Sequence, residues 1–160
     1  MRISTEKYIF LLIIQLCFLL TDLLFNAFSD SFRSKNINLL IIYILQIIFQ
    51  ILMFIALLIS LFQTNVFQAG FVILIYDRFK ATIVICLIYL VLTIGLHAWV
   101  LYYRWLEPTA YIWTDNFLLT LFVLHRMTSC LYYYLYKKSA LRISDPRFYE
   151  DEWINNQIRR

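Results

Sequence analysis

Long apolar runs separated by short polar segments dominate the chain. A helix needs about 20 apolar residues to cross the hydrocarbon core of a bilayer. Runs of sufficient length cover residues 8–28, 37–62, 81–103 and 113–136. The first run is longer than the apolar part of a signal peptide, about 7–15 residues, so we expect it to be retained. The pattern predicts an all-α polytopic membrane protein, with a four-transmembrane-helix bundle over residues 1–136.

A shorter apolar run lies between the second and third predicted spans. It covers residues 66–76 and is followed by the charged sequence Asp77-Arg78-Phe79-Lys80. Because the run is too short to cross a bilayer, it predicts a short interfacial or re-entrant helix over residues 66–80, which Gly70 allows to bend. An extension of the second span is the alternative interpretation.

The last segment, residues 137–160, is polar and basic. It follows an aromatic run of tyrosines and begins with Lys137-Lys138, as is typical of a membrane boundary. Asp145 and Pro146 have the types expected at the cap and first position of a helix. We therefore predict a basic cytosolic tail with a short C-terminal helix. Its aromatic face would lie on the membrane surface, which we favour, or bind a partner.

The distribution of lysine and arginine predicts the orientation. With four spans, the two termini and the segment between spans two and three lie on one side. That side carries ten basic residues, and the opposite side carries Arg33, Lys35 and Arg104 only. Basic residues mark the cytosolic side, so both termini are expected in the cytosol.

Polar residues recur at helical spacing inside the predicted spans. Since polar groups are costly in lipid, we expect each such stripe to turn inward and form an intramembrane polar seam with a structural role. The seam residues are Gln15, Asp22, Asn26, Gln46, Gln50, Thr93, His97, Asp115, Arg126 and Ser129. From their depths along the helices we expect an ion pair between Asp22 and Arg126, with His97 nearby. A pair that fixes helix packing is favoured over a proton or substrate relay.

Composition and motifs exclude several classes of protein. The chain is 62% hydrophobic and 15% charged, whereas soluble domains are about 25% charged. Its net charge of +4 comes from basic residues beside apolar runs and does not indicate nucleic-acid binding. We find no catalytic motif, and the two histidines lack the partners of a metal site, so we expect no enzyme activity, cofactor or metal. The cysteines Cys17, Cys86 and Cys130 are expected to be free thiols used in packing.

Several idiosyncratic segments occur along the chain: Val66-Phe67-Gln68-Ala69-Gly70, Phe79-Lys80, His97-Ala98-Trp99-Val100, Arg104-Trp105, Ile112-Trp113-Thr114-Asp115 and Asp145-Pro146-Arg147-Phe148-Tyr149. With them the chain closely resembles the transmembrane protein 138 family, and the resemblance runs from the first span to the last residues.

The resemblance implies a small four-span protein required for the assembly of primary cilia. It implies a location in the cilium and associated vesicle or vacuole membranes, a role in vesicular traffic to the cilium or its transition zone, and ciliopathy on loss. Other ciliary or transition-zone membrane proteins would be its partners, besides the lipid bilayer. No active site is known for the family, so the resemblance brings no catalytic residues.

Two hypotheses follow for the function. The first is a non-enzymatic ciliary membrane protein whose bundle carries a cytosolic face for partners or the membrane surface. That face comprises Phe67, Gly70, Arg78, Lys80, Lys137, Lys138, Asp145, Pro146, Phe148, Tyr149 and Trp153. The second is a small transporter or lipid-binding protein that uses Asp22, His97 and Arg126.

Overall fold

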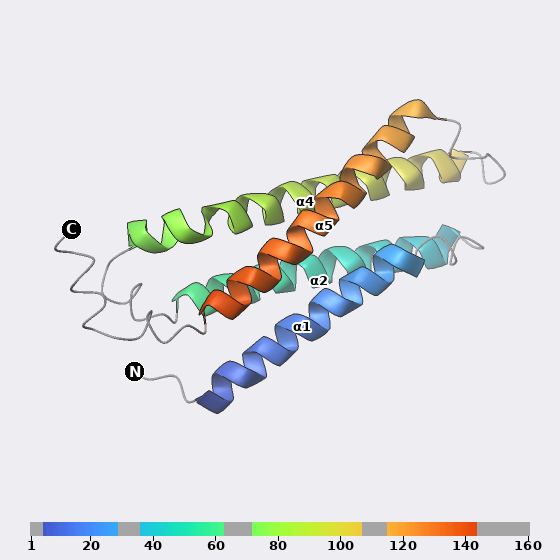
Figure 1. Ribbon diagram of the computed structural model, residues 1–160. Helices are drawn as coiled ribbons and strands as arrows, with labels where there is room; N and C mark the ends of the chain where they lie inside the picture. The colour runs from blue at the N-terminus through green and yellow to red at the C-terminus, as the bar shows by residue number, and fades with distance from the viewer. Residues whose placement is uncertain (1–4, 29–35, 63–71, 107–114, 144–160) are drawn as a thin grey trace.

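The computed structural model describes residues 5–28, 36–62, 72–106 and 115–143. These residues form the helices α1 (Thr5–Phe28), α2 (Asn36–Phe62), α4 (Val72–Leu106) and α5 (Asn116–Ile143), shown in Figure 1. Throughout this part of the chain the helices contain no proline, and the long side chains of leucine and isoleucine tolerate helical geometry well. The prediction of an all-α fold is confirmed for the described residues.

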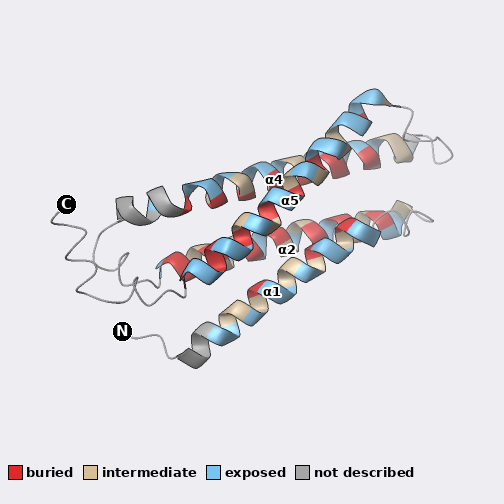
Figure 2. Cartoon of the chain, viewed as in Figure 1, coloured by how far each residue is buried: buried red, intermediate tan, exposed pale blue. Residues whose placement is uncertain are grey.

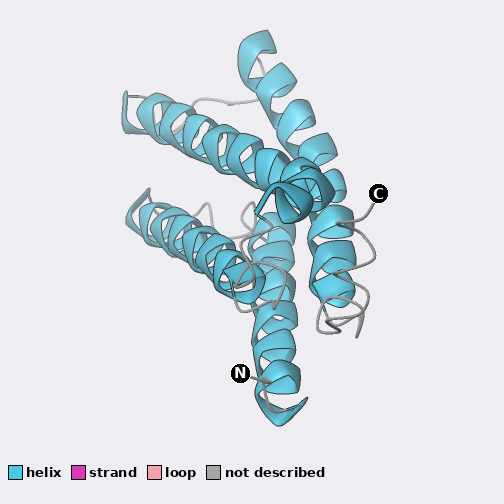
Figure 3. Ribbon diagram, turned by 90° about the vertical axis from the view of Figure 1, so that its left-hand side faces the viewer, coloured by secondary structure: helices cyan, strands magenta, loops and turns pink. Residues whose placement is uncertain are grey.

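The helices run alternately up and down along a common direction (Figure 1). The start of α1, the end of α2, the start of α4 and the end of α5 lie at one end of the bundle, which we call the terminal end. The most extensive contact joins α4 to α5, and α2 packs on both α1 and α4. Viewed from the side in Figure 3, the helices diverge from one another toward their ends.

The distribution of burial is the reverse of that in a water-soluble bundle. Figure 2 shows buried residues on the sides of the helices that face one another and exposed residues around the outside. Asp22, Gln46 and Thr93 are each 0% exposed, whereas Phe10 is 66% and Val91 is 68% exposed. Polar groups inside and apolar groups outside are the arrangement that a lipid environment stabilises. The chain is therefore a membrane protein.

Within the described residues, three helical segments are long and apolar enough to cross a membrane. They are Ile9–Phe28, Asn36–Phe62 and Phe79–Trp105, close to the first three predicted spans. Helix α5 has 28 residues, but His125, Arg126 and a run of tyrosines make it less apolar than the others. It begins after Asp115 and extends to Ile143, beyond the range predicted for the fourth span.

The second part of the predicted interfacial helix, residues 72–80, is not a separate helix. Residues 66–71 lie outside the described residues, but Val72–Lys80 forms the first turns of α4 and is continuous with the third span. The charges of Asp77, Arg78 and Lys80 were interpreted as the boundary between the interfacial helix and the third span. Charged residues do not end a helix as proline does, however. The three residues therefore lie within α4, which has 35 residues and is longer than a bilayer is thick.

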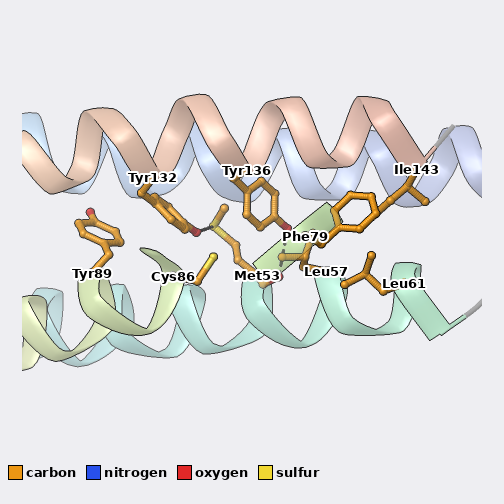
Figure 4. Packing of buried hydrophobic residues seen from close by; sticks show 9 residues of the cluster. All are labelled: Met53, Leu57, Leu61, Phe79, Cys86, Tyr89, Tyr132, Tyr136 and Ile143. Atoms are coloured by element: carbon orange, nitrogen blue, oxygen red, sulfur yellow. Dashed lines mark hydrogen bonds between the residues drawn. The ribbon is translucent and has the colours of Figure 1, made fainter. Parts of the chain in front are cut away.

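An apolar cluster fills the terminal half of the bundle between α2, α4 and α5 (Figure 4). It contains Met53, Leu57, Leu61, Phe79, Cys86, Tyr89, Tyr132, Tyr136 and Ile143. Two tyrosines of α5 bond to a single residue of α2: the Tyr132 hydroxyl donates to Met53 Sδ at 3.4 Å and the Tyr136 hydroxyl to the Met53 carbonyl at 3.0 Å. The tyrosine run thus packs into the bundle in part, and does not serve only as an interfacial belt.

The three cysteines are free thiols, as predicted. Only Cys86 packs in the core, because it lies on the inner face of α4. Cys17 and Cys130 lie on the exposed surface, so the predicted packing role is wrong for these two residues.

The buried hydroxyl of Tyr136 gives a direct test of this packing. We expect Tyr136→Phe to lower the free energy of unfolding by about 0.5–1.5 kcal/mol, because the Met53 carbonyl loses its additional hydrogen bond. Tyr134, two residues away and 61% exposed, is the matched control, and Tyr134→Phe should change stability much less. Denaturant titration in mixed micelles measures both. Equal effects would contradict the inward orientation of Tyr136.

Candidate functional site

A carboxylate from α1 lies at the centre of the bundle and is bonded by three helices. Asp22 Oδ1 accepts hydrogen bonds from Gln46 Nε2 at 3.3 Å and Gln50 Nε2 at 3.1 Å, both from α2. Asp22 Oδ2 accepts from the Tyr89 hydroxyl of α4 at 2.9 Å and the Tyr133 hydroxyl of α5 at 2.8 Å. Four donors converge on one side chain, a pattern that suits an ionised carboxylate, which can only accept hydrogen bonds.

Helical spacing places these side chains together. Asp22 and Asn26, Gln46 and Gln50, and Tyr89 and Thr93 are each four residues apart, so each pair lies on one face of its helix. Asn26 continues the network one turn along α1. Its Nδ2 lies 2.6 Å from the Tyr89 hydroxyl and 2.8 Å from the Tyr133 hydroxyl, and its Oδ1 accepts from Gln46 at 3.2 Å.

The network extends through Thr93 to α5. Gln50 Nε2 lies 3.1 Å from Thr93 Oγ1, and Thr93 Oγ1 lies 3.0 Å from His125 Nε2. Thr93 also donates to the carbonyl of Tyr89 at 2.8 Å, within its own helix. The four helices are therefore joined by one continuous set of buried polar contacts, which we call the polar network: Asp22, Asn26, Gln46, Gln50, Tyr89, Thr93, His125 and Tyr133.

The expected ion pair between Asp22 and Arg126 is wrong. Arg126 Nη2 donates instead to the main-chain carbonyl of Asn26, and its guanidinium lies 5.1 Å from the centre of the Phe122 ring. That carbonyl is one of the last four of α1, which have no partner within the helix. A cation there also interacts favourably with the negative end of the helix dipole. Arg126 thus caps α1.

The remaining seam residues lie apart from the polar network. Gln15 bonds to Ser60 Oγ at 2.8 Å and to the Ala56 carbonyl at 3.2 Å, and so joins α1 to α2 near the terminal end. His97 stacks on Tyr43 with ring centres 3.8 Å apart. Ser129 is buried but donates to the Arg126 carbonyl of its own helix.

Asp115 lies at the end of the bundle opposite the terminal end and directly precedes α5. Its Oδ1 accepts from the Phe117 amide at 3.0 Å, its carbonyl accepts from the Leu119 amide, and its Oδ2 accepts from Trp99 Nε1 at 3.2 Å. This residue is a helix cap that also holds α5 to α4. It was assigned to the seam because its spacing matches Arg126, but the helix starts only after it.

Removing this cap should have a modest effect. We expect Asp115→Ala to lower the free energy of unfolding by about 0.5–2 kcal/mol, because the Phe117 amide and the Trp99 Nε1 atom lose their acceptor. Asp115→Asn keeps one accepting oxygen and should retain much of the stability. The same denaturant titration compares the two variants, and an unchanged Asp115→Ala protein would argue against the cap.

The predicted cytosolic face is described only in part. Lys80, Lys137 and Lys138 are exposed at the terminal end of the bundle, and Lys138 lies 5.5 Å from the centre of the Tyr134 ring. Arg78 belongs to α4. The other residues of that face lie outside the described residues: Phe67, Gly70, Asp145, Pro146, Phe148, Tyr149 and Trp153.

Three members of the polar network were not among the predicted seam residues. Tyr89 precedes Thr93 and His97 by four and eight residues, so the same helical stripe contained it. Tyr133 continues the stripe of Arg126 and Ser129. Tyrosines near a membrane boundary were taken as belt residues, and His125 was considered only as a metal ligand.

Among the described residues, no group of three or more histidine, cysteine or acidic side chains could hold a metal ion. The carboxylate of Asp22 is saturated by four donors and has no second acid beside it. Within the described part of the chain, the site therefore gives no positive indication of catalysis.

Comparison with known proteins identifies the family. A profile of the family described as Transmembrane protein 138 matches residues 39–157. Transmembrane protein 138 of Xenopus tropicalis is 41% identical over 155 residues, covering 96% of this chain and 95% of the relative. The chain belongs to the transmembrane protein 138 family. The Danio rerio protein of that name is 40% identical, covering 99% and 98% of the two chains, and the Mus musculus protein is also 40% identical, covering 98% and 96%.

The resemblance found in the sequence is thus confirmed over nearly the whole chain. No solved structure matches it. Membership of the transmembrane protein 138 family agrees with the inverted burial of the bundle, and the family is not known as a family of enzymes.

Proposed function

We propose that this protein is a non-enzymatic, four-span membrane protein required for cilium assembly, acting in vesicular traffic to the cilium or at its transition zone. The observation that carries the proposal is the nearly full-length match to the transmembrane protein 138 family. The polar network supports the non-enzymatic part, because its members bond mainly to one another and leave Asp22 fully enclosed.

The fourth span in this proposal is α5. Its most exposed large side chains are mainly apolar, including Phe117 at 57%, Met127 at 65% and Leu131 at 55%, while His125, Ser129 and Tyr132 are buried. At about 1.5 Å per residue, Phe117 and Lys137 are separated by about 30 Å, the thickness of a hydrocarbon core. A low average hydropathy is thus compatible with a span whose polar side chains face the bundle.

The topology can be tested with epitopes in cells. A tag after Arg160 should be accessible to antibody when only the plasma membrane is permeabilised, together with a tag at the N-terminus. A tag inserted in residues 107–114 should stay protected on intracellular membranes, and at the cell surface it should be accessible without permeabilisation. If the C-terminal tag behaves like the 107–114 tag, α5 does not cross the membrane.

The face that binds partners would be at the cytosolic end, formed by residues 66–80 and 137–160. Lys80, Lys137 and Lys138 support this, because they are exposed together at the terminal end. Exposed basic residues beside a span suit an anionic leaflet or an acidic partner segment.

Rescue of ciliated cells that lack the protein tests the function. The full chain should restore the number of ciliated cells. A chain truncated after Ile143, which keeps the whole of α5 and its buried last turn, should reach membranes but fail to restore cilia, whereas Asp22→Asn should restore them if the network has no transport role. Rescue by the truncated chain with failure of Asp22→Asn at normal abundance would favour the small transporter or lipid-binding hypothesis.

A further inference from the structure

The guanidinium of Arg126 uses one of its three nitrogens inside the bundle. Arg126 Nη2 donates to the Asn26 carbonyl, and Arg126 Cζ lies 5.1 Å from the centre of the Phe122 ring. Within the described residues, Arg126 forms no further hydrogen bond and no ion pair, so Nε and Nη1 have no acceptor there. Neither atom is among the buried polar atoms that lack a partner. The unused N–H groups of Arg126 therefore reach the outer surface of the bundle.

This part of the surface lies near the middle of the bilayer. In the proposed topology, the hydrocarbon core extends along α5 from about Phe117 to Lys137. At about 1.5 Å per residue, Arg126 lies about 13–17 Å along the helix from each of these two residues. Arginine side chains extend to the interface when they lie near the end of a span, and Arg126 is too deep for that. Its exposed N–H groups therefore face hydrocarbon, where a charge without a partner is costly.

The surroundings of Arg126 suit another membrane helix. Val123 is 48% exposed, and Cys130 is also exposed, three and four residues from Arg126 on the same side of α5. On α1, Leu23 precedes Asn26 by three residues and is 43% exposed. An apolar surface with a short side chain such as that of cysteine lets the backbone of a second helix approach closely.

Neither a second copy of this chain nor a lipid headgroup fits this position. Among the described residues, the acid inside the spans is Asp22, which is 0% exposed. Glu6 and Asp77 lie in the first two turns of α1 and α4, and Asp115 directly precedes α5, so all three are far from mid-depth. Lipid headgroups lie about 15 Å from the middle of the bilayer. A carboxylate at this depth has to come from a helix of another protein.

We propose that this surface binds a transmembrane helix of another protein, one that carries an aspartate or glutamate near its middle. We call it the Arg126 face: Leu23, Phe122, Val123, Arg126 and Cys130. The unused N–H groups of a guanidinium can bond to both oxygens of a carboxylate, and each charge then removes the cost of the other in hydrocarbon. The proposal rests on α5 crossing the membrane, as proposed above, and concerns a different surface from the cytosolic face.

A model helix with a central acid tests the Arg126 face directly. The full-length protein, fused after Arg160 to a fluorescent protein, is placed in vesicles of neutral phosphatidylcholine with a labelled leucine-rich peptide of about 20 residues. One peptide carries aspartate at its centre, a second carries asparagine there, and a third carries the aspartate near one end. Energy transfer measures the binding of each peptide.

We expect the central aspartate to be preferred. That peptide should bind about tenfold more tightly than the asparagine peptide, because a charge-assisted hydrogen bond replaces a neutral one. The peptide with aspartate near one end should bind no better than the asparagine peptide, since its carboxylate lies at the wrong depth.

Three variants of the protein locate the binding. Arg126→Leu should remove the preference for aspartate. Because this variant also loses the cap of α1, Cys130→Trp is a second test: it covers the face one turn from Arg126, leaves the polar network in place and should also remove the preference. Val91→Trp, at a 68% exposed position of α4, is the matched control and should keep it.

Three results would overturn the proposal. Equal binding of the central aspartate and asparagine peptides to the wild-type protein would show that the charge of Arg126 is not recognised. Self-association of the protein that Arg126→Leu abolishes would assign the face to a second copy. Loss of peptide binding in vesicles rich in phosphatidylserine would assign it to an anionic lipid. The epitope experiment decides separately whether α5 crosses the membrane, so a wrong topology can be told from a wrong binding face.

Discussion

Replacing Asp22 by leucine is expected to destabilise the protein by about 3–5 kcal/mol, the cost of removing one partner from a buried charged network. The variant leaves four buried donors without their acceptor: two amides of α2 and the hydroxyls of Tyr89 and Tyr133. It also separates α1 from the three helices that meet at its carboxylate. Denaturant titration in mixed micelles measures the loss, and a lower abundance in cells should accompany it.

Asp22→Asn is the matched control for this prediction. Its Oδ1 can still accept from Gln46 and Gln50, and its amide can donate to the two tyrosine oxygens once their hydroxyls rotate. We therefore expect a loss clearly smaller than that of the leucine variant. If the two variants were equally unstable, the charge would matter and the hydrogen-bond geometry would not. If Asp22→Leu were fully stable, the polar network would have no structural role.

The inner faces of the helices could be predicted because lipid makes the pattern simple. Any polar residue in a long apolar run must turn away from lipid, so Asp22, Asn26, Gln46, Gln50 and Thr93 indicate the inner side of their helices without further information. The structure brings these five residues together. Spacing alone was enough to place each of them on the correct face.

Pairing between faces could not be predicted, because it depends on how the helices cross. The predicted depths assumed that the axes of α1 and α5 are aligned, with the two helices running in opposite directions, which put Arg126 opposite Asp22. Figure 1 shows α5 crossing the bundle obliquely, and Arg126 meets α1 one turn later, at the Asn26 carbonyl. A main-chain acceptor cannot be recognised from the sequence, because every residue has a carbonyl.

Tyr89 was missed for a different reason: a tyrosine is suited both to the membrane interface and to a buried hydrogen bond.

The beginning of α4 shows a different limit. A charged cluster near a predicted span indicates where water begins, and it does not indicate where a helix begins. Asp77 and Lys80 lie inside a 35-residue helix, which is longer than a hydrocarbon core requires. The charged cluster therefore did not mark the start of the helix, which begins at Val72.

Arg126→Leu is expected to lower the free energy of unfolding by about 1.5–3 kcal/mol, the range for a hydrogen bond to a charged group. The variant removes the cap from the Asn26 carbonyl, in a part of α1 that lies well inside the bundle. Gln46, which bonds to Asn26, lies about 15 Å along α2 from its first residue, Asn36. The Asn26 carbonyl is therefore far from the end of the bundle, and water has little access to replace Arg126. The last turn of α1 should then fray and weaken its contact with α5.

Two further variants separate the cap from the mere presence of a positive charge. Arg126→Lys keeps the charge near the negative end of the helix dipole but reaches the carbonyl less well, so it should recover part of the stability. Arg142→Leu, at an exposed position in the last turn of α5, should change stability by less than about 0.5 kcal/mol.

Thiol labelling of an added cysteine at Ala27, on the exposed side of α1, would report the fraying directly. A labelling rate that Arg126→Leu does not raise would mean that the end of α1 is held by its other contacts, chiefly those of Asn26 and Asp22.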